Sequence, residues 1–349
     1  MGKSGRWFRE VFREQLCLRI IQRPAIGIAS KPFYRPKRPI HFLSSIPMVL
    51  VFFCGCVGPK TVYRTNLSTP PPVAPQQTDK RLSIIQSTPP LVRGKIQNIS
   101  ITKNDGPFGV SRYGVSDGLR DGPKFGTATV YYPEDAQAPY ASLVIVPGFV
   151  HPESAMKAWG PFLASHGIVT LTIGANKLND DPLKRRDALL DAVHSLKAEH
   201  RREDSPLWHK LALDRIGVAG WSMGGGGAQL AAVADPSLRV VIGFCPWLPK
   251  ANFEHPVPSL IMAGTLDSIA NVFHNARAHY AGISEATPKM IIEIPRGGHW
   301  IANDPANANG AIGQISLSWL KVYLEGDTRY RQFLLTPPIS GGYFRHNLE

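Results

Sequence analysis

Residues 216–227 read IGVAGWSMGGGG, and they give the clearest indication of the fold. The apolar run 216–220 has the length of a buried strand, and a helix-length segment, 224–234, follows it. A G-x-S-x-G turn between a strand and a helix is the setting of a nucleophile elbow, in which a strained turn lifts a serine clear of the sheet. The helix that follows favours negative charge near its N-terminus. The stretch therefore predicts that Ser222 is a nucleophile.

The glycine run taken alone has two other interpretations. A Gly-rich turn can serve only to pack a helix closely against a strand, because glycine carries no Cβ. A phosphate-binding loop is also rich in glycine, but a Lys-Ser or Lys-Thr pair closes it, and residues 224–229 contain none of these residue types. The position between a strand and a helix favours the nucleophile.

The same alternation extends in both directions from about residue 106. Apolar runs of strand length are predicted at 128–132, 142–146, 168–173, 216–220, 240–244, 259–263 and 290–294. Amphipathic segments near 154–165, 182–201, 224–234, 272–281 and 309–324 are the predicted helices. This alternation predicts an α/β domain with a mainly parallel, doubly wound sheet and helices on both faces. Such sheets place their chemistry at the carboxyl ends of the strands.

A serine hydroxyl needs a base to become a strong nucleophile, and in this kind of fold the histidine comes last in the chain. The histidines that follow Ser222 are His255, His274, His279, His299 and His346. His299 follows the predicted strand 290–294 and a loop with two glycines, which can swing an imidazole over the serine. His274 and His279 fall in a predicted helix, where solvated residues are expected. His299 is therefore the predicted base.

The acid that orients this imidazole must lie between the serine and the histidine. The carboxylates considered are Asp235, Glu254, Asp267, Glu285 and Glu293. Asp235 ends the helix after the elbow, and Glu293 lies inside a predicted strand. Glu254 precedes a strand, and Glu285 connects a helix to one. Asp267 alone comes just after a strand, and it is the predicted acid.

The oxyanion of an acyl-transfer intermediate needs two backbone N–H donors. The elbow supplies one from the residue after the nucleophile, Met223. The other is expected from the loop that follows the predicted strand 142–146, and the N–H of Phe149 is the predicted donor.

Three aromatic residues come just after predicted strand ends, namely Phe149, Trp247 and Trp300. Core packing or a generic acyl pocket would explain each one alone, but together they predict a flat, aromatic-lined cleft. The connection 245–258 has only 14 residues, which leaves no room for a cap domain. An uncapped cleft is expected to admit bulky or polymeric esters.

With these motifs the sequence resembles the bacterial cutinases and polyester hydrolases, which include the poly(ethylene terephthalate) (PET) hydrolases and have an α/β-hydrolase fold. The resemblance covers about residues 106–335. The stretches that carry it are GPF at 106–108, TVYYP at 129–133, VPGF at 146–149, WGP at 159–161, LASHG at 163–167, GWSMG at 220–224, PW at 246–247, DSIA at 267–270, GGH at 297–299 and DTRY at 327–330.

The resemblance implies a triad of Ser222, Asp267 and His299 and an oxyanion hole formed by Phe149 and Met223. It further implies that Trp247 and Ile269 line the cleft and touch an aromatic ring of the substrate, a cutin-like or PET-like polyester.

The chain departs from the family pattern in three ways. The family usually has a disulfide near the C-terminus, and some members have a second beside the triad; neither can form, because Cys245 is the single cysteine of residues 106–349. Trp300 stands where Phe or Ser is commoner, which is expected to narrow the cleft. Asn271 stands where Pro is usual, which is expected to loosen the loop of the acid. These changes are expected to leave the ester chemistry intact but to reduce efficiency on a rigid aromatic polymer.

The N-terminal part of the chain has a different composition. Residues 1–41 carry +8 of the net charge of +13, and the body has no basic stripe with interleaved aromatics, which argues against a nucleic-acid partner. Residues 42–53 are mostly apolar, yet they are fewer than the ~20 residues that span a bilayer. They match the apolar region of a signal peptide.

The sequence Gly55-Cys56 after this apolar region resembles a bacterial lipobox, with Cys56 as the lipidated residue. Plain secretion and an uncleaved membrane anchor are the alternatives. The protein is therefore expected to be exported, either to the cell envelope as an outer-membrane lipoprotein or as a secreted protein. The expected organisation is a signal segment at 1–56, a proline-rich disordered tether at 57–105 and a catalytic domain at 106–349.

The sequence thus predicts a serine carboxylic-ester hydrolase that acts on polyesters through an acyl-enzyme. We expect no cofactor and no metal; the expected partners are the ester substrate and, through Cys56, a membrane. A monomer is expected. The alternatives are a short-chain carboxylesterase or lipase acting on soluble esters and, less favoured, a surface-anchored binding protein with an inactive hydrolase fold.

Overall fold

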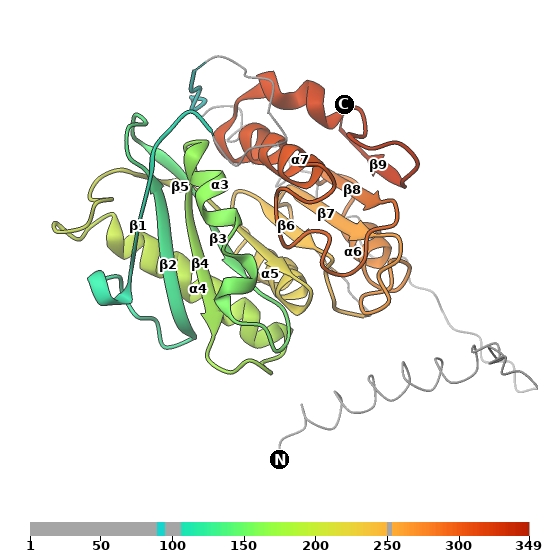
Figure 1. The fold of residues 1–349 in the computed structure, drawn as a ribbon, viewed down its shortest axis with the longest axis horizontal. Coiled ribbons are helices and arrows are strands. Elements are labelled where there is room, and N and C mark those ends of the chain that lie inside the picture. Colours follow the sequence, from blue (N-terminus) through green and yellow to red (C-terminus); the bar gives the residue numbers. More distant parts are fainter. Residues whose placement is uncertain (1–88, 95–105, 250–252, 349) are drawn as a thin grey trace, which may run out of the picture. The chain divides into compact units, whose positions relative to one another are not determined.

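The computed structural model describes residues 89–94, 106–249 and 253–348. The expected signal segment, the lipidation site Cys56 and most of the expected tether lie outside these residues. The described chain forms one nine-stranded sheet in the order β1-β2-β4-β3-β5-β6-β7-β8-β9 (Figure 1). The strands are β1 Val110–Gly114, β2 Phe125–Pro133, β3 Tyr140–Val146, β4 Val169–Ala175, β5 Leu211–Trp221, β6 Val241–Phe244, β7 Ser259–Gly264, β8 Lys289–Ile294 and β9 Phe344–His346.

The sheet is parallel in its centre and antiparallel at its edges. Strands β4, β3, β5, β6, β7 and β8 pair in parallel, whereas β1, β2 and β9 pair antiparallel to their neighbours. All seven predicted strands are present, and the predicted α/β fold with a mainly parallel sheet is confirmed. The sequence did not predict β1 and β9, because these short edge strands carry no sustained apolar run and depend on pairing with β2 and β8.

Five α-helices connect the strands in the described residues. They are α3 Trp159–Ser165, α4 Pro182–Glu199, α5 Met223–Ala234, α6 Ala276–Gly282 and α7 Ala311–Leu320. The helix predicted near 154–165 is a 3₁₀ turn at Glu153–Met156 followed by α3. The helix predicted at 309–324 is α7 followed by one π-helical turn, Lys321–Glu325.

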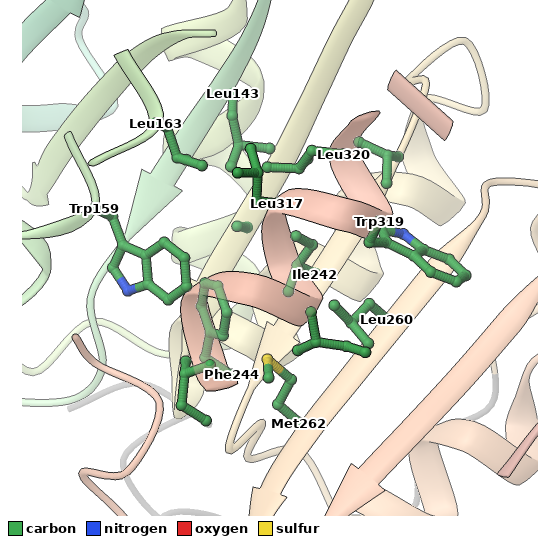
Figure 2. Packing of buried hydrophobic residues seen from close by; sticks show 14 of the residues in the cluster. Leu143, Trp159, Leu163, Ile242, Phe244, Leu260, Met262, Leu317, Trp319 and Leu320 are labelled. Carbon is green, nitrogen blue, oxygen red and sulfur yellow. The ribbon is translucent and has the colours of Figure 1, made fainter. Parts of the chain in front are cut away.

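Alternating side chains of the strands bury apolar residues on both faces of the sheet, because successive residues of a strand point to opposite faces. A smaller cluster lies between α6 and strands β7 and β8. Leu143 belongs to the layer that α3 and α7 cover, whereas its neighbour Val144 belongs to the layer that α4 and α5 cover. Figure 2 shows the first layer, where Leu317 and Trp319 of α7 pack with strand residues that include Leu260. The sheet is thus buried on both faces, as a parallel sheet requires.

Residues 89–94 belong to the range expected to be tether, and they are bonded to the folded body. The N–H of Leu91 donates to the carbonyl of Glu325 at 2.8 Å, and Arg329 Nη1 donates to the carbonyl of Gly94 at 2.9 Å. The buried Arg215 also donates to the carbonyl of Pro89. The side chain of Arg93 donates to the carbonyls of Gln137 and Pro139 and pairs with Glu325 at 3.4 Å. None of the helices in the described parts of the chain is both long and apolar enough to cross a membrane.

Truncation of one α7 side chain should show how strongly this layer holds the fold. Leu317 is fully buried in the layer shown in Figure 2, and Leu317→Ala is expected to lower the free energy of unfolding by about 2–5 kcal/mol. Leu335→Ala is the control, because this leucine is 44 % exposed, and its change should stay within about 0.5 kcal/mol. Urea denaturation followed by circular dichroism measures both. Equal losses in the two variants would contradict the layered core.

Candidate active site

Ser222 lies at the junction of β5 and α5 in a strained backbone conformation. Its φ is +57° and its ψ is −122°, a combination that non-glycine residues rarely adopt. Three backbone hydrogen bonds hold it there. The N–H of Ser222 donates to the carbonyl of Phe244 at 2.9 Å, and its carbonyl accepts from Gly226 at 3.1 Å and from Trp247 at 2.7 Å. The surrounding loops therefore stabilise a serine that the turn presents at the carboxyl edge of the sheet.

The glycines around Ser222 are required by close backbone contacts. A Cβ added to Gly220 would lie 2.1 Å from the carbonyl oxygen of Gly224, and a Cβ added to Gly224 would lie 2.5 Å from that of Val146. A Cβ added to Gly148, in the loop after β3, would lie 2.7 Å from the Cβ of Ser222. Both the elbow and the loop expected to hold the oxyanion are therefore packed against the serine.

His299 connects Ser222 to Asp267. Its Nε2 lies 2.8 Å from Ser222 Oγ, and its Nδ1 lies 2.7 Å from Asp267 Oδ2. The three residues come from the loops after β5, β7 and β8 and are only 6 %, 5 % and 7 % exposed, in the order Ser222, Asp267 and His299. Because a carboxylate only accepts hydrogen bonds, Nδ1 carries the proton and Nε2 is left to accept from the serine. The structure thus brings all three predicted side chains into one series of hydrogen bonds.

The carboxylate of Asp267 is held by its own loop. Its Oδ1 accepts from the N–H of Ile269 at 2.9 Å and from that of Ala270 at 2.8 Å. These bonds leave Oδ2 directed at His299, so the loop sets the orientation of the imidazole as well. Asn271, expected to loosen this loop, accepts through Oδ1 from the N–H of Phe273 at 3.0 Å and through its carbonyl from that of Asn275 at 3.0 Å.

The remaining acidic candidates have other partners or lie elsewhere. Glu293 pairs with Arg277 at 2.6 Å, and Glu285 pairs with Lys289 at 2.8 Å. Asp235 caps its own turn, where its Oδ1 accepts from the N–H of Ser237 at 3.0 Å, and Glu254 is exposed.

For the other histidines, the structure corrects one of the expectations from the sequence. His274 is exposed, but it lies in a turn before α6. His279 was expected to be a solvated helix residue, and this is wrong: it is fully buried in α6, with Nε2 3.2 Å from the carbonyl of Leu248. Burial lowers its pKa to about 4, so it is neutral near pH 7. A helix of seven residues gave too short a pattern to show which face packs inward.

The two predicted oxyanion donors come from segments that meet at Ser222. Met223 is the first residue of α5, and its backbone N–H is one of the groups that a helix leaves without an internal partner. Phe149 follows Gly148 in the loop after β3. Its carbonyl lies 2.7 Å from His151 Nδ1, and the carbonyl of Gly148 accepts from Arg185 Nη2 at 2.9 Å. The carbonyls of Gly148 and Phe149 thus both have side-chain partners, which fix the orientation of this loop.

Aromatic rings form one wall beside the histidine. The ring of Trp221 lies 5.0 Å from that of His299 and 4.3 Å from that of Trp300, and His151 contacts both tryptophans. Trp221 Nε1 also donates to the carbonyl of His299 at 2.8 Å. Sequence reasoning missed Trp221 and His151, because the residue between Gly and Ser in the elbow motif is unrestricted and His151 lies in no motif.

The residues expected to line the cleft differ in exposure. Ile269 and Trp300 are 48 % and 45 % exposed, so both offer apolar surface beside the three bonded side chains. Trp247 is only 5 % exposed, and its N–H is one of the two donors to the Ser222 carbonyl.

Cys245 lies beneath the acid and was not considered as a site residue. Ligand atoms of Cys245, Asp267 and His299 come within 4.8 Å of one another, which is close enough for a metal ion. Complete burial raises the pKa of the Cys245 thiol, and the neighbouring Asp267 carboxylate raises it further. A neutral thiol is a poor metal ligand, and the two other groups already bind each other. The donor set therefore fits a metal poorly.

The chain matches the PET hydrolase-like family model over residues 86–346. It is 36 % identical over 241 residues to a bis(hydroxyethyl) terephthalate hydrolase from Streptomyces coelicolor, a match that covers 68 % of this chain and 74 % of that protein. It is 34 % identical over 239 residues to cutinase 1 from Thermobifida cellulosilytica, across 68 % of this chain and 88 % of that protein. A cutinase from Thermobifida fusca is 34 % identical over 239 residues, across 68 % of this chain and 76 % of that protein.

The close backbone contact at the elbow can be tested with paired glycine substitutions. Gly220→Ala would place a Cβ 2.1 Å from a backbone oxygen, and such overpacking is expected to cost about 1–3 kcal/mol of unfolding free energy. Gly298→Ala is the matched control, because a Cβ at Gly298 meets nothing within 4 Å. Denaturant titration of both variants measures the difference. A Gly220→Ala protein as stable as Gly298→Ala would show that the junction has room to spare.

Proposed function

The chain belongs to the PET hydrolase-like family of carboxylic ester hydrolases, and from this membership we propose that it hydrolyses polyesters with Ser222 as the nucleophile, His299 as the base and Asp267 as the orienting acid. The observation that carries the proposal is the unbroken series of hydrogen bonds, 2.8 Å from serine to imidazole and 2.7 Å from imidazole to carboxylate. The three residues of this series come from segments more than 30 residues apart in the chain, and they meet at one edge of the sheet.

Acylation begins when His299 Nε2 takes the proton of Ser222 Oγ as the oxygen attacks the ester carbonyl carbon. The carbonyl π electrons move to its oxygen, and the N–H groups of Phe149 and Met223 stabilise the resulting oxyanion. When the tetrahedral intermediate collapses, the bond to the alcohol oxygen breaks and His299 returns the proton to that oxygen. The alcohol leaves, and the acid part of the substrate stays bound to Ser222 as an ester.

Deacylation repeats the same steps with water. His299 removes a proton from water, the hydroxide attacks the acyl carbon, and the same two N–H groups hold the second oxyanion. Collapse expels Ser222 Oγ, which takes its proton back from His299, and the carboxylic acid leaves. Asp267 exchanges no proton in either half. It stabilises the imidazolium and holds it in the correct orientation through bonds fixed by the loop at Ile269 and Ala270.

The exposed side chains beside Ser222 support a polymeric aromatic substrate. Trp300 and Ile269 present apolar surface next to the proposed triad, and an aromatic ring of a chain segment could stack there. The relatives are named for a terephthalate ester and as cutinases. Only residues 245–258 separate β6 from β7, so the connection is too short for a cap domain.

One observation favours the second candidate, a short-chain carboxylesterase or lipase that acts on soluble esters. The side chain of Trp247, which the family resemblance assigns to the cleft, is almost completely buried. A cleft without this ring offers less surface to a long aromatic segment. The two candidates share the acyl-enzyme chemistry and differ in substrate size alone.

Removal of the proposed triad should abolish ester hydrolysis. Ser222→Ala and His299→Ala are each expected to lower kcat/KM for p-nitrophenyl butyrate by at least about 10⁴-fold, and Asp267→Asn by about 10³–10⁴-fold. His274→Ala is the control, because this exposed histidine lies outside the series of hydrogen bonds. Circular dichroism confirms that each variant is folded. Substantial activity in folded Ser222→Ala would contradict the role of Ser222 as the nucleophile, and it would not distinguish the two substrate classes.

The substrate class can be tested on Trp300. The enzyme is expected to release terephthalate-type products from amorphous PET film. Loss of the stacking surface in Trp300→Ala should lower that release, relative to p-nitrophenyl butyrate hydrolysis, by about 2–10-fold. Trp208→Ala is the matched control, because Trp208 is 44 % exposed but follows α4, away from the triad loops. Chromatography of the products measures the release.

Three other results would each have a distinct meaning. Hydrolysis of the butyrate without any release from PET or from an aliphatic polyester film would favour the short-chain esterase. A higher release from Trp300→Ala would show that this ring narrows the cleft. An equal change in Trp208→Ala would show that the effect is not specific to the site.

A further inference from the structure

Arg185 is a buried cation directly behind the proposed oxyanion hole. It lies in the first turn of α4 and is 0 % exposed. Its Nη2 donates to the carbonyl of Gly148 at 2.9 Å and to the carbonyl of Leu178 at 3.0 Å. Its Nε and Nη1 have no hydrogen-bond partner among the described residues. Burial lowers its pKa to about 10, so it remains charged at pH 7.

A buried positive charge in this position lowers the stability of the fold, so packing alone does not explain why an arginine is present. Burying a guanidinium without a carboxylate partner costs several kcal/mol. In the described chain Arg185 hydrogen-bonds to carbonyl groups alone, and Asp180 and Asp181 act on its charge without a hydrogen bond to it. A neutral amide side chain could bridge two carbonyls at less cost. The positive charge itself is therefore the feature to be explained.

The carbonyl of Gly148 belongs to the same peptide group as the N–H of Phe149. A peptide group is planar and trans, so its C=O and its N–H point in opposite directions. A bond that fixes the oxygen therefore fixes the direction of the N–H, which is the predicted oxyanion donor. A cation at the oxygen also polarises the group, which makes its N–H a stronger donor.

The second acceptor of Arg185 extends this support to the rest of the loop. The carbonyl of Leu178 accepts from Arg185 and also from the N–H of Val150 at 2.7 Å. Arg185 thus bonds on both sides of Phe149, directly at Gly148 and through Leu178 at Val150. The donor peptide is held at its carbonyl, and the next peptide group of the chain is held at its N–H, by bonds that lead to a single guanidinium.

Gly227, the last glycine of the run 224–227, makes room for this arrangement. A Cβ added to Gly227 would lie 2.6 Å from the Cβ of Arg185, so α4 reaches this depth because α5 has no side chain at that point. Gly220 and Gly224 serve the turn of Ser222 itself, whereas Gly227 serves the approach of Arg185.

We propose that Arg185 is a positioning residue for ester hydrolysis, whose guanidinium orients and polarises the peptide group between Gly148 and Phe149 so that the Phe149 N–H stabilises the oxyanion. The inference rests on the proposed function. Arg185 touches no substrate and exchanges no proton. Its effect is confined to the transition state, where negative charge develops on the carbonyl oxygen.

Substitutions at Arg185 separate this role from simple packing. Loss of a direct oxyanion donor costs about 10²–10³ in kcat, and loss of support for one is expected to cost about 10-fold or more. Arg185→Gln should therefore lower kcat for p-nitrophenyl butyrate by about 10-fold or more, with KM changed by less than about twofold. Phenylboronic acid, which forms a tetrahedral adduct with a serine, should bind more weakly by a similar factor.

Two further variants complete the test. Arg185→Lys keeps the charge but not the fork, so its kcat should lie between those of wild type and Arg185→Gln, at least about threefold below wild type. Arg186→Gln is the matched control, because Arg186 is partly exposed and pairs with Asp187 instead. Its kcat, KM and boronate affinity should equal those of wild type. All values are normalised to the folded fraction measured by circular dichroism.

A wild-type kcat in folded Arg185→Gln would overturn the inference, as would equal losses in kcat and in ground-state binding. If Arg185→Gln does not fold, Arg185→Lys decides, and a wild-type kcat in that variant would overturn the inference. Failure of the proposed function looks different, because wild type would then lack esterase activity or Ser222→Ala would retain it.

Discussion

The contact between the first turn of α5 and its neighbours is the constraint on which the site depends. Four glycines in succession let this turn lie against the loop after β3, the loop after β6 and the start of α4. At the head of the turn Ser222 takes a positive φ, which the hydrogen bonds to Phe244, Gly226 and Trp247 make tolerable. Side chains at these glycines would separate the elements that must touch, so the Gly-rich run is as much part of the site as the serine is.

Around this junction the fold uses buried side chains to hold backbone groups. Trp221 donates to the carbonyl of His299, which joins the strand before the nucleophile to the loop of the base. Arg185 holds two carbonyls of the loops around Phe149, and the buried Arg215 donates to the carbonyls of Glu325 and Pro89. These loops lack the regular backbone hydrogen bonds of helices and strands. Because a buried carbonyl without a partner is destabilising, such side-chain donors hold the loops in place. The precision of the site therefore comes from outside the three residues proposed to react.

The carboxyl edge of the sheet combines buried polar groups with exposed apolar side chains. The hydrogen-bonded series is deep and nearly dry, whereas Ile269 and Trp300 stand at its rim with half of their surface open. The two residues for which the family resemblance implies a departure, Trp300 and Asn271, lie at this rim and in the loop of the acid.

The seven main strands, the elbow and the identity of the three side chains that meet could all be predicted from the residues. The reason is local: strand periodicity, a glycine motif and the order of residues after strand ends are all written along the chain. Tertiary structure alone decided the edge strands β1 and β9, the attachment of residues 89–94, the burial of His279 and the partners of Trp221 and Arg185. These features join distant segments, mostly through backbone atoms that every residue possesses, so no residue type marks them in advance.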